Sequence, residues 1–109
     1  MSIVSRYLAV TQGNLDNHHF YLTEVLDMFP EDVFGGPEEA QAAARSVRVQ
    51  WGNEVVETDI DRTKNSFRKR GWVGGFFDEN RVQAGDRLLL EQVEPYLYRV
   101  SKAEQAVES

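Results

Sequence analysis

Apolar and polar residues alternate most clearly in the middle of the chain. Residues 47–51 place Val, Val and Trp at every second position, with Arg and Gln between them. This period of two predicts a strand with one buried face. Gly52 and Asn53 follow as a turn signal, and residues 55–60 form a second apolar run. We therefore expect a β-hairpin over residues 47–60.

Further short apolar runs lie on both sides of this hairpin, bounded by Gly, Pro, Asn or Asp. They predict strands at 3–10, 20–22, 67–72, 87–93 and 96–100. Turns are expected at 12–14 and 83–86, the second of them the Gln-Ala-Gly-Asp sequence. Many short strands separated by turns favour a mainly β barrel or sandwich with one or two short helices.

Helical segments are predicted to be few and short. Residues 25–29 suit a helical turn that Pro30 closes, and residues 74–80 suit a turn followed by a short helix. Residues 38–44 combine helix-forming Ala and Gln with acidic side chains at the N-terminal end, which favours a short helix or a loop with helical character. The polar stretch 102–109 is expected to be a frayed tail.

Composition narrows the class of protein. The chain has 109 residues, which suits a single domain over 1–109, and it contains no cysteine. No apolar run approaches the roughly 18 residues that a membrane span needs. Without thiols, disulfides and thiolate metal sites are excluded, and a reducing cytoplasmic location is expected. We expect no cofactor, because no glycine-rich phosphate-binding loop is present.

The charge is unevenly distributed. The net charge is −6, yet residues 62–87 hold seven basic and three acidic side chains, a local charge of +4. Residues 16–57 hold nine acidic and two basic side chains, a local charge of −7. The acidic total argues against a non-specific nucleic-acid coat, but the layout leaves a basic face that a polyanion can approach.

An ordered set of residues resembles a known family. It comprises the hairpin at 47–60, a polar loop, Gly71-Trp72, Phe76-Phe77, Val82, and Gly85-Asp86 followed by Leu88–Leu90. In order and spacing it resembles the DNA-binding pseudobarrel family, which includes the plant B-three domains and the effector domains of bacterial type II restriction endonucleases. The resemblance spans residues 20–100 and implies an open seven-stranded pseudobarrel.

The resemblance also implies recognition of duplex DNA by two arms. One arm maps to residues 23–36, and the other to residues 61–67. In and beside the second arm, the expected DNA-binding residues are Arg62, Lys64, Asn65, Ser66, Arg68, Lys69 and Arg70. Their guanidinium, ammonium, amide and hydroxyl groups suit phosphate oxygens, and Asn can pair with adenine. We expect a non-enzymatic role in restriction or other DNA processing, with a nuclease partner supplying the chemistry.

The first arm departs from this pattern. It contains Glu24, Asp27, Glu31 and Asp32 and no Lys or Arg, and carboxylates repel phosphates. One alternative is therefore a protein-interaction module that uses the acidic face 24–39 and no longer binds DNA. A second alternative is an RNA-binding barrel that stacks bases on aromatic residues at 96 and 98.

Two other sets of polar residues suggest chemistry only weakly. Adjacent His18 and His19 would point to opposite faces of a strand, and no third metal ligand is evident. Asp59 and Asp61 share a face, as paired catalytic carboxylates do, but no partner base or nucleophile accompanies them. We expect neither a metal site nor catalysis.

Overall fold

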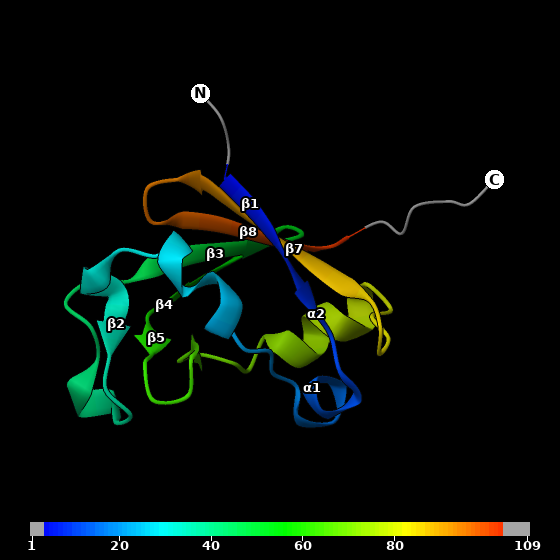
Figure 1. The fold of residues 1–109 in the computed structure, drawn as a ribbon, viewed down its shortest axis with the longest axis horizontal. Coiled ribbons are helices and arrows are strands. Elements are labelled where there is room, and N and C mark those ends of the chain that lie inside the picture. The colour runs from blue at the N-terminus through cyan, green and yellow to red at the C-terminus, as the bar shows by residue number, and fades with distance from the viewer. Residues whose placement is uncertain (1–3, 104–109) are drawn as a thin grey trace.

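The larger of two β-sheets contains five strands. The computed structural model describes residues 4–103. The strand order is β1-β7-β8-β3-β4 (Figure 1). Their bounds are β1 Val4–Ala9, β3 Val47–Trp51, β4 Glu54–Thr58, β7 Arg87–Glu94 and β8 Leu97–Lys102. Neighbouring strands pair antiparallel except β3 and β8, which run parallel.

The predicted central hairpin is confirmed. Strands β3 and β4 pair antiparallel from Val47 opposite Thr58 to Trp51 opposite Glu54. Gly52 has φ +56°, a left-handed conformation that glycine adopts without the penalty of a Cβ. The inward-facing residues of β3 are buried and the alternate ones are not, as the period of two predicts.

The smaller sheet joins the two segments that resemble the family's arms. It contains β2 Phe34–Gly35, β5 Ile60–Asp61 and β6 Ser66–Phe67 in the order β2-β5-β6. Strand β2 runs parallel to β5, and β5 pairs antiparallel with β6. The segment 23–36 and the loop 61–67 are therefore neighbours, because β2 ends the first and β5 opens the second.

Two α-helices and three short 3₁₀ turns complete the described chain. Their bounds are α1 Gln12–Asn17, α2 Val73–Glu79, η1 Thr23–Met28, η2 Glu31–Val33 and η3 Glu39–Gln41. Helix α2 confirms the helix predicted after Gly74, and η1 confirms the helical turn before Pro30. Helix α1 replaces the predicted turn at 12–14, because Thr11 and Asn14 form a reciprocal capping box that starts a helix there.

An aromatic cluster connects the sheets to helix α2. The rings of Trp51 and Trp72 stack with centroids 6.1 Å apart, and Phe76 meets Trp51 edge-on at 5.9 Å. Phe20 meets Phe67 and Trp72 edge-on, each at 6.0 Å. Phe76 therefore belongs to the core, and the partly buried Trp72 packs against it.

Three expectations about local structure are wrong. Residues 20–22 do not form a strand. Phe20 packs in the aromatic cluster, and the Leu22 N–H donates a backbone hydrogen bond to the Asn65 carbonyl. Of residues 67–72, only Phe67 lies in a strand. The Arg68 N–H still donates to the Asp59 carbonyl, and helix α2 begins at Val73. Lys102 does not belong to a frayed tail, because it is the last residue of β8; residues 104–109 of that prediction lie outside the described residues.

The mainly β class with few short helices is confirmed. The described residues form eight strands, where seven were expected, because the smaller sheet is made of two-residue strands. Within residues 4–103, no helix is long and apolar enough to cross a membrane.

Candidate nucleic-acid interface

The loop between β5 and β6 is held by its own side chains and backbone. The carboxylate of Asp61 accepts hydrogen bonds from the backbone N–H of Thr63 at 2.9 Å and of Lys64 at 3.3 Å. Such a bond is an Asx turn, which fixes the chain direction after the aspartate. Asn65 completes the turn with φ +53°, a conformation that asparagine tolerates better than most residues. The loop thus presents Lys64 to solvent in a defined place.

Besides Arg62, four of the predicted DNA-binding residues remain accessible: Lys64, Asn65, Lys69 and Arg70. We call these four residues the basic strip. Among residues 4–103, none of its three cations has an acidic partner within ion-pair distance. The Trp72 indole N–H donates to the carbonyl of Lys69 at 2.8 Å, which anchors the end of the strip to the aromatic cluster.

Arg68 is a structural residue. Its Nε donates to Oδ1 of Asp59 at 2.7 Å, and its terminal nitrogens donate to Asp59 Oδ2, to the Gly36 carbonyl and to the Glu38 carbonyl. Only 16% of the Arg68 side chain and 8% of the Asp59 side chain are exposed. The structure thus places Arg68 inside the protein, where its donors are already engaged.

Ser66 is also enclosed. It is 1% exposed, and its Oγ has no hydrogen-bond partner among the described residues. A side chain so covered cannot reach a phosphate from its present position. Sequence reasoning placed Ser66 in an exposed loop because its neighbours are polar, whereas the pairing of β6 with β5 turns it inward.

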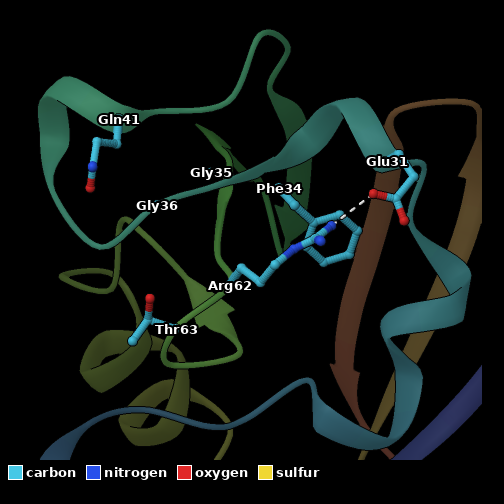
Figure 2. A pocket seen from close by; sticks show the side chains of 7 residues that line it. All are labelled: Glu31, Phe34, Gly35, Gly36, Gln41, Arg62 and Thr63. Carbon is cyan, nitrogen blue, oxygen red and sulfur yellow. Dashed lines mark hydrogen bonds and ion pairs between the residues drawn. The ribbon is translucent and has the colours of Figure 1, made fainter.

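Arg62 is engaged by the first arm. Its Nη2 lies 2.8 Å from Oε2 of Glu31, and its guanidinium carbon lies 4.6 Å from the centre of the Phe34 ring. Figure 2 shows this arrangement beside an open cavity of about 550 Å³ lined also by Gly35, Gly36, Gln41 and Thr63. Both side chains of the ion pair are exposed, 58% for Arg62 and 89% for Glu31.

The carboxylates of the first arm are partly matched within the protein. Besides the Glu31 pair, Asp27 contacts Arg6 at 3.2 Å, and Asp32 accepts a hydrogen bond from the Tyr96 hydroxyl at 3.0 Å. These contacts reduce the repulsion that an approaching phosphate chain would meet. Of these contacts, the Glu31–Arg62 ion pair joins the acidic arm to the basic loop.

The sequence analysis considered His19 only as a metal ligand and did not single out Tyr21, whose ring contacts it. The His19 and Tyr21 rings lie 4.7 Å apart, and Tyr21 is 48% exposed. Partial burial, and then the charge of Arg70, lower the pKa of His19 below 6.5. The alternation of Phe20 and Leu22 with His19 and Tyr21 was the available signal, since it puts the latter pair on one outer face.

The RNA-binding alternative loses its aromatic pair. Tyr98 is fully buried, its hydroxyl donates to the Met28 carbonyl at 2.7 Å, and its ring stacks on Phe29. The Arg45 guanidinium carbon lies 3.8 Å from the centre of the Tyr96 ring. A buried ring cannot stack on a base, so residues 96 and 98 do not form the expected platform.

The carboxylates considered for catalysis have structural partners. Asp59 binds Arg68 and the Ala43 N–H, and Asp61 caps its own loop. Across the part of the chain that the structure describes, no three His, Asp or Glu side chains gather as a metal site would require.

The fold and the surface define a small, mainly β domain whose basic strip lies on the loops before and after β6 in the smaller sheet. No family model and no curated protein matches the sequence. Among solved structures, the fold is similar to the N-terminal domain of Helicobacter pylori LlaJI.R1. The TM-score is 0.59 at 15% sequence identity, over 97% of this chain and 90% of that chain. At this identity the similarity concerns the fold.

Proposed function

We propose that this chain is a non-catalytic domain that binds duplex DNA through the basic strip. The observation that carries the proposal is that Lys64 and Lys69 are exposed, and Arg70 is partly exposed, without ion-pair partners among the described residues. A cation that is already ion-paired with a carboxylate adds little to phosphate binding. A cation without such a partner can neutralise a DNA phosphate and release the counterions bound to the DNA.

The role of each residue follows from its chemistry. Lys64, Lys69 and Arg70 hold backbone phosphates and set the position of the domain on the duplex. Asn65, next to Lys64 on the same turn, is the strip's candidate for reading a base, because an amide can pair with both hydrogen-bonding groups of adenine in the major groove. Arg62 becomes available only if the Glu31 carboxylate releases it.

The similarity to the N-terminal domain of LlaJI.R1, a restriction-system protein, supports a DNA-related role. On this proposal the domain supplies recognition in a cytoplasmic restriction or other DNA-processing system. A nuclease partner or a further domain supplies the cleavage chemistry, since the carboxylates at 59 and 61 are engaged in holding the fold.

A duplex-binding titration at several salt concentrations tests the proposal. The decisive variant combines Lys64→Ala, Lys69→Ala and Arg70→Ala. We expect it to weaken binding and to make the slope of log affinity against log salt shallower by about 0.9 for each phosphate that is no longer neutralised. The matched control combines Arg48→Ala, Arg81→Ala and Arg87→Ala, which removes three exposed cations from elsewhere. Absence of binding at about 50 mM salt, or equal weakening in both variants, contradicts the proposal.

A second candidate function uses the acidic face. Glu24, Glu38 and Glu39 are exposed and have no ion-pair partner within residues 4–103, so a basic protein could dock there. Titration with a lysine-rich peptide distinguishes the two functions. Charge reversal by Glu24→Lys and Glu39→Lys should abolish peptide binding on this alternative, while the triple variant of the basic strip should leave it intact.

A further inference from the structure

A cavity of about 370 Å³ is lined by residues of β1, α1 and η1 and of the segments between them. Strand β1 and η1 are in contact, and the chain runs from one to the other through α1 (Figure 1). The volume is within the range of small-ligand pockets, roughly 300–1,000 Å³. No residue of the basic strip lines this cavity, so it is separate from the proposed DNA interface.

Asn14 brings a hydrogen-bond donor without a partner to the cavity. The residue is 5% exposed and lines the cavity. Its Oδ1 accepts the Thr11 N–H at 2.9 Å, which fixes the orientation of the amide because only the oxygen can accept. Within residues 4–103, Asn14 Nδ2 donates no hydrogen bond. A covered amide nitrogen without an acceptor is unfavourable, so the cavity suits a ligand that presents an oxygen to Asn14.

Tyr21 and Glu24 give the same cavity groups that attract a cation. Tyr21 is 48% exposed, and the exposed Glu24 carboxylate has no ion-pair partner among the described residues. An open aromatic face and a carboxylate both bind positive charge. Arg6 does not neutralise Glu24, because its guanidinium donates to the Glu24 carbonyl and pairs with the carboxylate of Asp27 at 3.2 Å.

The surroundings of the cavity are acidic. The three elements around it contain three carboxylates and one cation, which are Asp16, Glu24, Asp27 and Arg6. Among the described residues, no Lys or Arg lines the cavity. The His19 ring contacts Tyr21 at 4.7 Å, and partial burial, followed by the charge of Arg70, holds the pKa of His19 below 6.5. At pH 7 this imidazole is therefore neutral and does not repel a cation.

We propose that this cavity receives the lysine side chain of a partner protein. The ammonium group binds the Glu24 carboxylate against the Tyr21 ring, and the peptide carbonyl of the lysine accepts from Asn14 Nδ2. The methylene stem lies along Leu8, since lysine covers apolar surface with its stem while its charged end stays at a polar site. Lysine suits the cavity better than arginine, because a compact ammonium can serve a carboxylate and a ring that lie in different directions.

This docking pocket goes beyond DNA binding and does not depend on it. It also differs from docking on the acidic face 24–39 as a whole. A pocket needs the ring of Tyr21 and the amide of Asn14, and it does not need the exposed carboxylates of Glu38 and Glu39, which do not line the cavity.

The experiment titrates the whole, isotopically labelled chain with two peptides whose ends are capped. One is Ser-Gly-Lys-Gly-Ser, and the other has norleucine in place of lysine. NMR follows the side-chain amide signal of Asn14 and the backbone signals of Leu8 and Glu24. We expect the lysine peptide to shift these signals saturably and the norleucine peptide to leave them unchanged. Tyr21→Ala and Glu24→Gln should each weaken lysine-peptide binding about two- to fivefold, whereas Tyr21→Phe should retain it.

Tyr7→Ala and Glu39→Gln are the matched controls, because they remove a half-exposed tyrosine ring and an exposed carboxylate from outside the cavity. Neither should change the affinity for the lysine peptide. Equal shifts with the norleucine peptide, or the absence of a saturable shift, overturn the inference. Equal weakening by Glu39→Gln and Glu24→Gln also overturns it, because the acidic arm would then act through its total charge.

The duplex titration is a separate measurement, so the two proposals can fail separately. Loss of the lysine response with DNA binding intact contradicts only the docking pocket. If Tyr21→Ala does not fold, the comparison of the two peptides with the wild-type chain and the Glu24→Gln variant still decide.

Discussion

Arg68 and Asp59 form an enclosed ion pair at the point where the chain passes from the larger sheet to the smaller one. Asp59 lies between β4 and β5, and Arg68 follows β6. The same guanidinium donates to the carbonyls of Gly36 and Glu38, and Asp59 also accepts the N–H of Ala43. The pair therefore fastens the segment 36–43 to the junction of the two sheets.

Asp59→Asn is expected to destabilise the protein by about 3 kcal/mol, because it leaves the enclosed Arg68 charge without its partner. Burial acts to raise the pKa of Asp59, but the hydrogen bonds from Arg68 and Ala43 and the Arg68 charge together lower it below 3.8. A lowered folded-state pKa gives stability that is present above the unfolded value and lost as the pH falls through the folded value.

The difference between wild type and Asp59→Asn should therefore be full at pH 7 and shrink below about pH 4. Urea unfolding at pH 7, 5 and 3 measures it. Arg70→Ala is the control, because Arg70 is a cation of the same loop with no ion pair among the described residues. A deficit that does not change with pH would contradict the assignment of the stability to this carboxylate.

Gly35→Ala is expected to disturb the same junction. A Cβ at Gly35 would lie 2.7 Å from Ala43 N, from Gln41 O and from a terminal nitrogen of Arg68. Two of these neighbours are backbone atoms, so the segment has to move, at a cost of about 1–3 kcal/mol. Thermal unfolding tests this, and Gly71→Ala is the matched control, since a Cβ at Gly71 would meet nothing within 4 Å.

The sequence was a good guide where local pattern decides the structure. The hairpin β3–β4 follows from alternation around Gly52, and helix α2 follows from the apolar residues after Gly74. It predicted the structure poorly where a short run of polar residues is compatible with two local structures. The polar residues at 11–17 suit both a turn and a short helix, and the capping box between Thr11 and Asn14 selects the helix.

The position of the candidate site stays a prediction, and the partners of its side chains could not be predicted from the sequence. Sequence alone treats Arg62, Arg68 and Lys64 alike, since each is a cation in or beside the second arm. Their difference comes from partners far away in the chain: Glu31 is 31 residues from Arg62, and the carbonyl of Gly36 is 32 residues from Arg68. Ion pairing through distant residues follows from the sheet topology, which the spacing of charges does not reveal.

Glu31→Gln is expected to strengthen DNA binding by releasing Arg62. The pair is exposed, so its removal should change the stability by less than about 1 kcal/mol. If Arg62 then contacts one phosphate, the slope of log affinity against log salt should steepen by about 0.9. Binding titrations at three or more salt concentrations, together with an unfolding curve, measure both quantities.

Glu24→Gln is the matched control for this change, because it removes one negative charge of the same arm from a residue that is not paired with Arg62. Equal gains in the two variants would mean that the acidic arm acts through its total charge. In the double variant Glu31→Gln with Arg62→Ala, the gain should disappear.

Tyr98→Phe is expected to cost about 1–2 kcal/mol, because it leaves the buried Met28 carbonyl without its donor. Burial raises the pKa of Tyr98 to about 12, while an unfolded tyrosine titrates near 10. The unfolded chain thus loses this proton first, and the contribution of Tyr98 to stability, complete below pH 10, declines as the pH rises towards 12. Urea unfolding at pH 8 and pH 11 should show that the difference in unfolding free energy between wild type and Tyr98→Phe becomes smaller at the higher pH.

Tyr96→Phe is the control. The Tyr96 hydroxyl donates to Asp32 nearer the surface, so its removal should lower the unfolding free energy by less. A gap that stays constant between the two pH values would mean that the hydroxyl of Tyr98 stabilises the fold in some way other than as a protonated donor.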